Sequence, residues 1–323
     1  DHLAVAESLA TLAGIKMAKY NYEEAVGYGR QALEIRRRHL DEDDPLLAAT
    51  AAGFSVALSS LGQLEEADAL SREALEVLQR VRGPNHPQTI EAMGMRAQVL
   101  RRLERYDEAE QIYLEALDRQ RSLFGPVAEE NARTLNNLAY LLKIRGDLEG
   151  AERRYKEAMA IQDQILVRAH PQSIVVRQNL AGALVGQDKY DEAEHYLWEV
   201  LELRRELLPE GHGQIAGTIV TGVGRILLDR QKYVEAEPLL REALAICQNN
   251  PRVADAYTEI VRGSLAACLF GLGRMDEAGI EVGRSLALLE TVDEFSRVES
   301  YNIPWVATQL EAAGQPELAQ RYS

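Results

Sequence analysis

Apolar residues recur along this chain at the three- and four-residue intervals that place side chains on one face of an α-helix. In the stretch from 131 to 171 this spacing predicts two helices. The first carries Leu135, Leu138, Ala139, Leu141 and Leu142, and the second carries Leu148, Ala151, Tyr155, Ala158, Met159 and Ile161. We expect the first helix to end at Gly146, because glycine readily takes the left-handed conformation of a helix end. Asp147 is then a suitable cap for the second helix.

This two-helix pattern repeats along almost the whole chain. Counterparts of Ala151 follow one another at a spacing of 42, apart from one interval of 43 and a last one of 41, as Ala25, Ala67, Ala109, Ala151, Ala193, Ala236, Ala278 and Ala319. A small residue of the first helix keeps the same period, as Ala13, Ser55, Ala97, Ala139, Ala181, Gly224, Ala266 and Ala307. A period held this closely indicates a repeat architecture. The single interval of 43 gives the sixth repeat one extra residue.

The period predicts an all-α solenoid of about seven 42-residue helix pairs and a C-terminal capping pair. In a solenoid each repeat contacts only its neighbours, so length sets no limit on the fold. We therefore expect a single domain over 1–323. The predicted repeats are 3–44, 45–86, 87–128, 129–170, 171–212, 213–252 and 253–295, and the predicted cap is 296–323.

These residues resemble tetratricopeptide repeats. The long period, the run TLNNLAYLL from Thr134 to Leu142 and the pair His170-Pro171 are similar to the kinesin-light-chain type of this repeat. The resemblance covers Leu3 to about Tyr322. It implies a right-handed superhelix whose first helices line a concave groove, and it implies that the groove binds an extended peptide. The closing stretch QLEAAGQPELAQRYS is also similar to the end of repeat arrays attached to some bacterial serine/threonine kinases.

The charge of the chain narrows the class of partner. It has 36 basic and 51 acidic residues, a net charge of −15. Nucleic acids and anionic membranes attract clustered positive charge, so we expect neither as the main partner. No apolar run reaches the ~20 residues that span a bilayer and no signal peptide is visible, so we expect a cytoplasmic protein. The sequence starts at Asp1, almost inside a helix, and we expect it to be a fragment of a longer protein.

Histidines and paired carboxylates recur with the repeat, which indicates structural roles. His86, His170 and His212 fall in equivalent loops. Packed helices lie ~8–10 Å apart, too far for these side chains to share an ion whose ligands lie at ~2 Å. Acidic pairs such as Glu23-Glu24 fall at the start of second helices, where negative charge favours the helix dipole. We therefore predict no metal site.

Other catalytic chemistry is also missing from the sequence. Cys247 and Cys268 lie at apolar positions, which predicts buried free thiols, with a disulfide between neighbouring helices as the alternative. No nucleophile has a plausible base nearby, and no phosphate-binding or kinase motif occurs. We predict that the chain is not an enzyme and holds no cofactor.

The polar side of the first helices carries the candidate binding residues, which the resemblance assigns to the groove. They are Gln98, Arg101, Arg133, Asn136, Asn137, Tyr140, Lys143, Gln178, Asn179, Thr221 and Arg225. Asn and Gln both donate and accept hydrogen bonds, which suits the backbone of an extended peptide. Arg and Lys add a preference for carboxylates. The alternative is a solvated face, but Asn is a poor residue for exposed helix interiors.

The first two repeats differ at the matching positions. Their residues there are mostly small or apolar, namely Ala10, Thr11, Gly14, Ala49, Ala52, Gly53, Val56 and Ser59. We expect this end to be wider and more apolar, and to accept bulky side chains of a ligand. Lys16 and Arg96 are charged where the repeat favours an apolar residue. Arg96 is expected to extend its head to solvent or to pair with a nearby acid, and the sequence does not explain Lys16.

Together these patterns predict a non-catalytic scaffold for a protein or peptide partner, whose concave groove holds an extended acidic segment. One alternative is a regulatory or self-assembly module of a larger enzyme, such as a bacterial serine/threonine kinase, whose own segment fills the groove. Another is a receptor for small signalling peptides, which predicts a DNA-binding domain before Asp1. The sequence identifies neither the ligand nor the oligomeric state.

Overall fold

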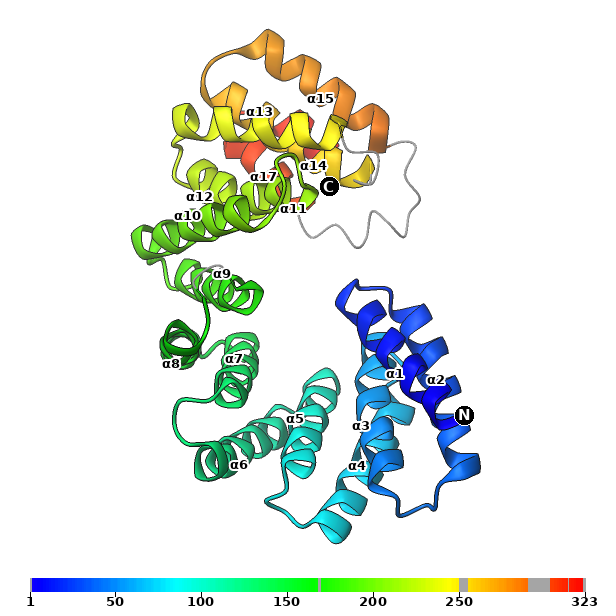
Figure 1. Ribbon diagram of the computed structural model, residues 1–323. Helices are drawn as coiled ribbons and strands as arrows, with labels where there is room; N and C mark the ends of the chain where they lie inside the picture. Colours follow the sequence, from blue (N-terminus) through cyan, green and yellow to red (C-terminus); the bar gives the residue numbers. More distant parts are fainter. Residues whose placement is uncertain (1, 168–169, 250–254, 290–302, 313, 322–323) are drawn as a thin grey trace. The chain divides into compact units, whose positions relative to one another are not determined.

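The computed structural model describes residues 2–167, 170–249, 255–289, 303–312 and 314–321, which form helices and turns with no strand among them. The helices are α1 (His2–Ala18), α2 (Tyr22–His39), α3 (Pro45–Ser60), α4 (Leu64–Arg82), α5 (Pro87–Arg102), α6 (Tyr106–Phe124), α7 (Glu129–Ile144), α8 (Leu148–Ile165), α9 (Pro171–Val185), α10 (Tyr190–Leu207), α11 (Gly213–Thr218), η1 (Ile219–Val223), α12 (Gly224–Asp229), α13 (Tyr233–Asn249), α14 (Asp255–Gly271), α15 (Met275–Leu289), α17 (Ile303–Ala312) and α18 (Pro316–Gln320). Successive helices pack as pairs (Figure 1), beginning with α1 on α2. The predicted all-α fold of paired helices is confirmed.

The chain divides into two compact units, Asp1–Leu166 and Val167–Ser323. In the first unit each second helix also contacts the first helix of the next pair, as α2 does with α3, α4 with α5 and α6 with α7. In the second unit α9 packs on α10, α14 on α15 and α17 on α18. A single domain over 1–323 stays a prediction. The predicted boundary between the seventh repeat and the cap lies outside the described residues.

The turn inside each described pair has one backbone geometry. One residue of the turn has a φ between 56° and 89°, at Tyr20, Gly62, Glu104, Gly146, Asp188, Gln231, Gly273 and Gly314. The next residue donates its N–H to a carbonyl five positions earlier, as Asp147 does to Leu142 at 2.9 Å. Gly146 therefore lies at the left-handed end after α7, as predicted. Asp147 Oδ1 accepts the N–H of Gly150 at 2.8 Å and caps α8, also as predicted.

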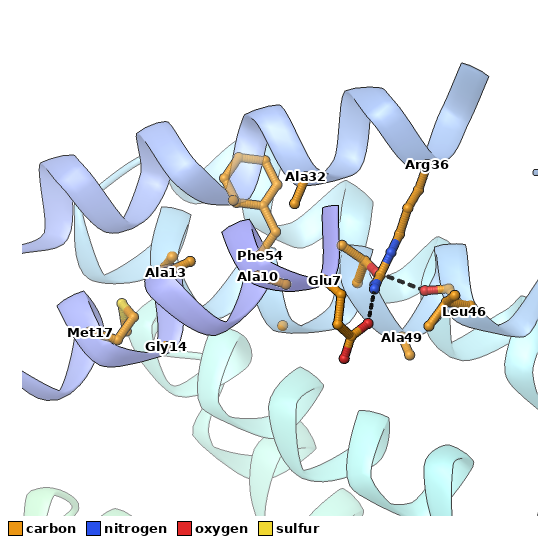
Figure 2. Close-up of a pocket in the computed structure, with 14 residues that line it drawn as sticks. Glu7, Ala10, Ala13, Gly14, Met17, Ala32, Arg36, Leu46, Ala49 and Phe54 are labelled. Atoms are coloured by element: carbon orange, nitrogen blue, oxygen red, sulfur yellow. Dashed lines mark hydrogen bonds and ion pairs between the residues drawn. The ribbon is translucent and has the colours of Figure 1, made fainter. Parts of the chain in front are cut away.

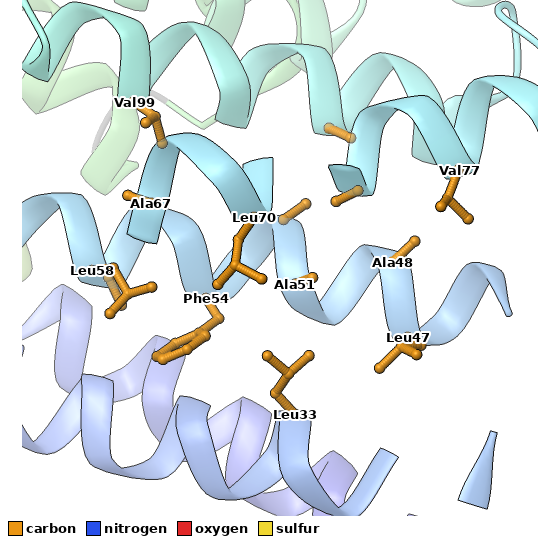
Figure 3. Close-up of a cluster of buried hydrophobic side chains, with 14 of the residues drawn as sticks. Leu33, Leu47, Ala48, Ala51, Phe54, Leu58, Ala67, Leu70, Val77 and Val99 are labelled. Carbon is orange, nitrogen blue, oxygen red and sulfur yellow. The ribbon is translucent and has the colours of Figure 1, made fainter. Parts of the chain in front are cut away.

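The alanines that mark the repeat form the most buried line of the core. Each has an exposed fraction of 0%, at Ala25, Ala67, Ala109, Ala151, Ala193, Ala236, Ala278 and Ala319. A methyl group at this position lets neighbouring helices approach closely. Larger side chains fill the remaining space, and in the first unit Leu33, Phe54 and Leu70 join α2, α3 and α4 in one buried cluster (Figure 3). Removing this apolar surface from water is the main force that holds the pairs together.

The extra residue of the sixth repeat lies in a π-helical turn. η1 interrupts an otherwise α-helical element, with α11 before it and α12 after it. Thr218 lies two full periods after Thr134, whereas Gly224 lies two periods and one further position after Ala139. A π-helical turn absorbs one added residue within a helix, so both flanking segments keep their buried faces.

None of the described helices combines the length and the apolar composition that a membrane crossing requires.

Candidate functional site

Seven of the candidate binding residues lie on α5 and α7, and we refer to them together as the α5–α7 patch. They are Gln98 and Arg101 on α5, and Arg133, Asn136, Asn137, Tyr140 and Lys143 on α7. The two helices contact each other within the first unit. The Arg101 guanidinium carbon lies 5.0 Å from the centroid of the Tyr140 ring. A guanidinium over an aromatic face is attracted by the ring quadrupole, so this pair ties the two helices together.

The patch presents hydrogen-bonding groups at its surface. Arg133 and Tyr140 are exposed, and the other five side chains are half-buried. Asn136 Nδ2 lies 3.5 Å from Asn137 Oδ1, a long contact at the limit of hydrogen-bonding distance. A primary amide carries two donors and an oxygen with two acceptor sites. The two neighbouring amides therefore place both kinds of hydrogen-bonding group in the patch.

The three cations of the patch lie apart from the carboxylates in the described part of the chain. Among the described residues, Arg101, Arg133 and Lys143 have no carboxylate oxygen within 4.0 Å. Burial lowers the pKa of Lys143, because removal from water disfavours the ammonium form. Other arginines of this unit pair with acids of a neighbouring repeat, namely Arg30 with Glu66, Arg80 with Asp43, Arg121 with Glu157 and Arg145 with Glu110.

The remaining candidates lie in the second unit. They are Gln178, Asn179, Thr221 and Arg225. Gln178 Oε1 accepts a hydrogen bond from Arg204 Nη2 at 3.1 Å, so this side chain helps to join α9 and α10. Thr221 is exposed on the π-helical turn, and Arg225 Nε lies 3.9 Å from Asp229 Oδ2. A binding role for these four residues stays a prediction.

A cavity of about 270 Å³ lies between α1, α2 and α3 (Figure 2), at the end of the chain where the sequence predicts a wider, apolar surface. Four of the small residues behind that expectation line it, namely Ala10, Gly14, Ala49 and Gly53. Thr11, Ala52, Val56 and Ser59 are not part of its lining. Phe54 forms part of the wall, and most of the remaining wall is alanine and glycine.

The polar end of this cavity was not foreseen from the sequence. Arg36 on α2 donates from Nη2 to Glu7 Oε2 on α1 at 2.5 Å. Its Nη1 donates to Thr50 Oγ1 on α3. One signal was available, because Arg204 and Thr218 lie four full periods after Arg36 and Thr50 and make the same contact at 2.5 Å.

The structure explains both charged residues that depart from the repeat. Lys16 forms an ion pair with Glu24 at 2.5 Å. Arg96 Nη1 reaches Asp68 Oδ1 at 2.5 Å and Ser71 Oγ at 2.8 Å. The expectation that Arg96 pairs with a nearby acid is confirmed. Its side chain is 7% exposed and ends at this acid instead of in open solvent.

Ser71 and Arg96 form a contact between neighbouring helix pairs that recurs elsewhere with the small and the large residue on exchanged helices. One period earlier Gly29 on α2 lies against Phe54 on α3, and a Cβ added to the glycine would be 2.5 Å from the ring. Four periods later Leu197 lies against Gly222, whose added Cβ would be 3.3 Å from the leucine. At these three places one packing position is therefore filled from one helix or from the other.

The recurring histidines cap helices, which confirms a structural role. His86, His170 and His212 each accept a backbone N–H two residues ahead through Nδ1, at 3.2–3.3 Å. No group of three or more possible metal ligands occurs in the described part of the chain. Cys247 and Cys268 are buried free thiols. Burial raises their pKa values to about 11 and about 12, so both are predominantly protonated at neutral pH.

The sequence of the chain matches two models of one protein family. A tetratricopeptide repeat model matches residues 3–76, 56–122 and 130–206, and a second one matches 179–251. No curated protein matches the chain.

Three solved structures have similar folds at low sequence identity. The nearly identical TPR-like repeats of a putative kinesin light chain from Podosopora anserina are 19% identical, with a TM-score of 0.50 over 64% of this chain and 98% of that one. A signal transduction ATPase with numerous domains and a tetratricopeptide repeat sensor, from Pyrococcus horikoshii, is 16% identical, with a TM-score of 0.66 over 98% of this chain and 44% of that one. A Rap protein complexed with Competence and Sporulation Factor is 16% identical, with a TM-score of 0.59 over 90% and 76%.

Proposed function

The chain belongs to the tetratricopeptide repeat family, and from this premise we propose that it is a non-catalytic scaffold that binds an extended acidic segment of a partner protein. The segment lies along the first helices of the pairs, on the side that carries the α5–α7 patch. A Rap protein of similar fold, complexed with Competence and Sporulation Factor, is a precedent for ligand binding by such an array.

The observation that carries the proposal is the charge of the α5–α7 patch. Arg101, Arg133 and Lys143 lack a carboxylate partner among the described residues, in a chain whose net charge is −15. Ligand carboxylates would supply the missing partners through charge-assisted hydrogen bonds. They would also offset the desolvation cost that lowers the pKa of Lys143. The surrounding negative charge repels acidic ligands elsewhere and directs them to this surface.

The amides of the patch have a separate task. Asn136 and Asn137 present donors and acceptors beside the cations, which suits the alternating N–H and C=O groups of an extended backbone. In the second unit Asn179, Thr221 and Arg225 are separate candidates for contacts with a ligand. Gln178 is the weakest candidate, because its oxygen already accepts from Arg204.

The charge argument is tested with labelled ten-residue peptides of Gly and Ser that carry no, two or four Asp residues. We expect affinity for the wild-type chain to rise with each added pair of Asp. The double variant Arg133→Gln, Lys143→Gln should bind the four-Asp peptide about tenfold more weakly, a change of about 1.4 kcal/mol.

The matched control changes two exposed arginines on second helices, Arg72→Gln and Arg153→Gln. Neither has an ion pair among the described residues, so their replacement breaks no salt bridge there. Like the patch variant, the control removes two positive charges. It should keep the wild-type affinity. An equal loss in both double variants would mean that only net charge matters, and the patch assignment would fail. A further variant, Asn137→Ala with Asn179→Ala, should bind more weakly than wild type with little loss of folding.

A further inference from the structure

The cavity between α1, α2 and α3 has the size of a side-chain pocket. Its volume is about 270 Å³, and a dry apolar cavity of roughly 150 Å³ already holds benzene. Alanine and glycine form most of the wall, among them Ala10, Gly14 and Gly53, and Phe54 adds an aromatic ring. A leucine or phenylalanine side chain therefore fits within it and would exchange water for apolar contacts.

The space exists because the first repeat lacks a side chain that the fifth repeat has. In the second unit Gln178 Oε1 accepts a hydrogen bond from Arg204 Nη2. Four periods earlier the matching residue is Ala10, which lines the cavity. Glu7, one helical turn earlier, accepts from Arg36 in its place. Glu7 thus supplies the hydrogen-bond acceptor in place of a glutamine, but at Ala10 no side chain fills the volume that a glutamine would occupy.

The charged pair at the end of the cavity has spare capacity. Arg36 is 4% exposed, and its Nε has no acceptor among the described residues. Its counterpart Arg204 donates to three oxygens, from Gln214, Thr218 and Gln178, whereas Arg36 donates to two. The Glu7 side chain is 69% exposed. A buried arginine with an unused N–H donor favours a ligand that brings an oxygen.

We propose that this cavity is an anchor pocket for one bulky apolar residue of the bound peptide, with Arg36 meeting a main-chain carbonyl of that residue and Glu7 a main-chain N–H. The inference rests on the proposed function and adds a specificity to it. The α5–α7 patch selects acidic residues, and the pocket selects a leucine-sized or larger apolar residue elsewhere in the same ligand.

The probe is a set of blocked peptides, acetyl-Gly-Gly-X-Gly-Gly-amide, in which X is Ala, Leu or Phe. Binding is followed by NMR of the chain labelled at its methionine methyl groups. The chain has five methionines, and of these only Met17 lines the cavity. We expect the Met17 signal to shift saturably when the Leu or the Phe peptide is added. The dissociation constants of these two peptides should be at least tenfold lower than that of the Ala peptide.

Two glycine substitutions separate the pocket from the rest of the surface. An added Cβ at Gly53, in the wall, and at Gly27, on α2 outside the cavity, meets no atom within 4 Å. Both tolerate Gly→Leu without a clash at Cβ, and both gain helix propensity. Gly53→Leu fills the pocket and should abolish the Met17 shift. Gly27→Leu should leave the shift unchanged.

The signals of the other four methionines verify that both variants are folded. A Met17 signal that no peptide moves, or that moves equally in Gly53→Leu, overturns the anchor pocket. If the four-Asp peptide still binds in that case, the inference fails while the proposed function stands. If acidic peptides do not bind but Met17 still responds to Leu and Phe, the proposed function fails instead.

Discussion

At the scale of single residues, the position just before the first helix of a pair caps that helix with different side chains in different repeats. Asp44, His86, His170 and His212 lie at intervals of 42 or multiples of it, and each accepts the N–H two residues ahead. The remaining member of the series is Ala128, before α7, which makes no such bond. Satisfying one of the first N–H groups of a helix is the function of an N-cap, so α7 begins with a weaker cap than its counterparts.

The cap position gives a stability prediction. Ala128→Asn should raise the free energy of unfolding by about 1 kcal/mol, and His86→Ala should lower it by about the same amount. Asn is preferred to Asp because Glu129 and Glu130 already lie in the first turn of α7. Urea unfolding measures both changes. Opposite or absent effects in both variants would contradict the capping role.

Two buried tyrosines give a second residue-scale prediction. Tyr113 and Tyr155 are 1% and 0% exposed, and neither hydroxyl has a partner among the described residues. Burial raises the pKa of both. Replacement by Phe removes a desolvated polar group without loss of a bond, so Tyr113→Phe should stabilise the chain by about 1 kcal/mol.

The control for that prediction is Tyr190→Phe, because this hydroxyl bonds to Asp188 Oδ1 at 2.9 Å. Its loss should give no gain in stability. Urea unfolding of both variants decides the point, and a destabilised Tyr113→Phe would indicate that the buried hydroxyl is satisfied in solution.

At the scale of helices, the repeat keeps its turns constant and varies the packing between pairs. Inside the described helix pairs, half of the eight turn residues with positive φ are not glycine, so the closing hydrogen bonds, and not glycine alone, fix this conformation. The exchange of Gly29 and Phe54 for Leu197 and Gly222 shows that one contact position between neighbouring pairs is filled by different side chains. The π-helical turn preserves the buried faces around an added residue.

Deletion of one residue tests the role of the π-helical turn. Removal of Thr221, which is exposed there, restores the regular period of the repeat, and the free energy of unfolding should change by less than about 1 kcal/mol. Removal of Val175, exposed on α9, should cost about 2 kcal/mol or more, because it rotates the buried Ile174 out of its site. Equal losses by urea unfolding would contradict this account.

The sequence was sufficient for features that repeat locally. Periodicity predicts the helix pairs, and Gly146 and Asp147 predict a turn and a cap that the structure confirms. The π-helical turn was not foreseen, because an interval of 43 does not reveal where a helix absorbs the added residue. The polar end of the cavity was missed because Glu7 and Arg36 lie 29 residues apart and meet only through packing.

At the scale of the whole molecule, the cations differ in whether they are paired with acids: many arginines form ion pairs between repeats, and, in the described part of the chain, those of the α5–α7 patch do not. The net charge is −15, and many arginines are held in ion pairs between neighbouring repeats, such as Arg30 with Glu66 and Arg241 with Glu277. Exposed ion pairs stabilise little individually, but they neutralise cations along the second helices. The cations of the α5–α7 patch have no such acidic partner among the described residues, and our proposal that they meet the carboxylates of a ligand is the central claim of this account.

The most direct test is a pull-down from a random peptide library with the wild-type chain, carried out at low and at high salt. The account predicts enrichment of acidic peptides at low salt, loss of that enrichment at high salt through screening, and its absence in the Arg133→Gln, Lys143→Gln variant. Folded protein that enriches no acidic peptides, or that enriches them equally at both salt concentrations, would contradict the account.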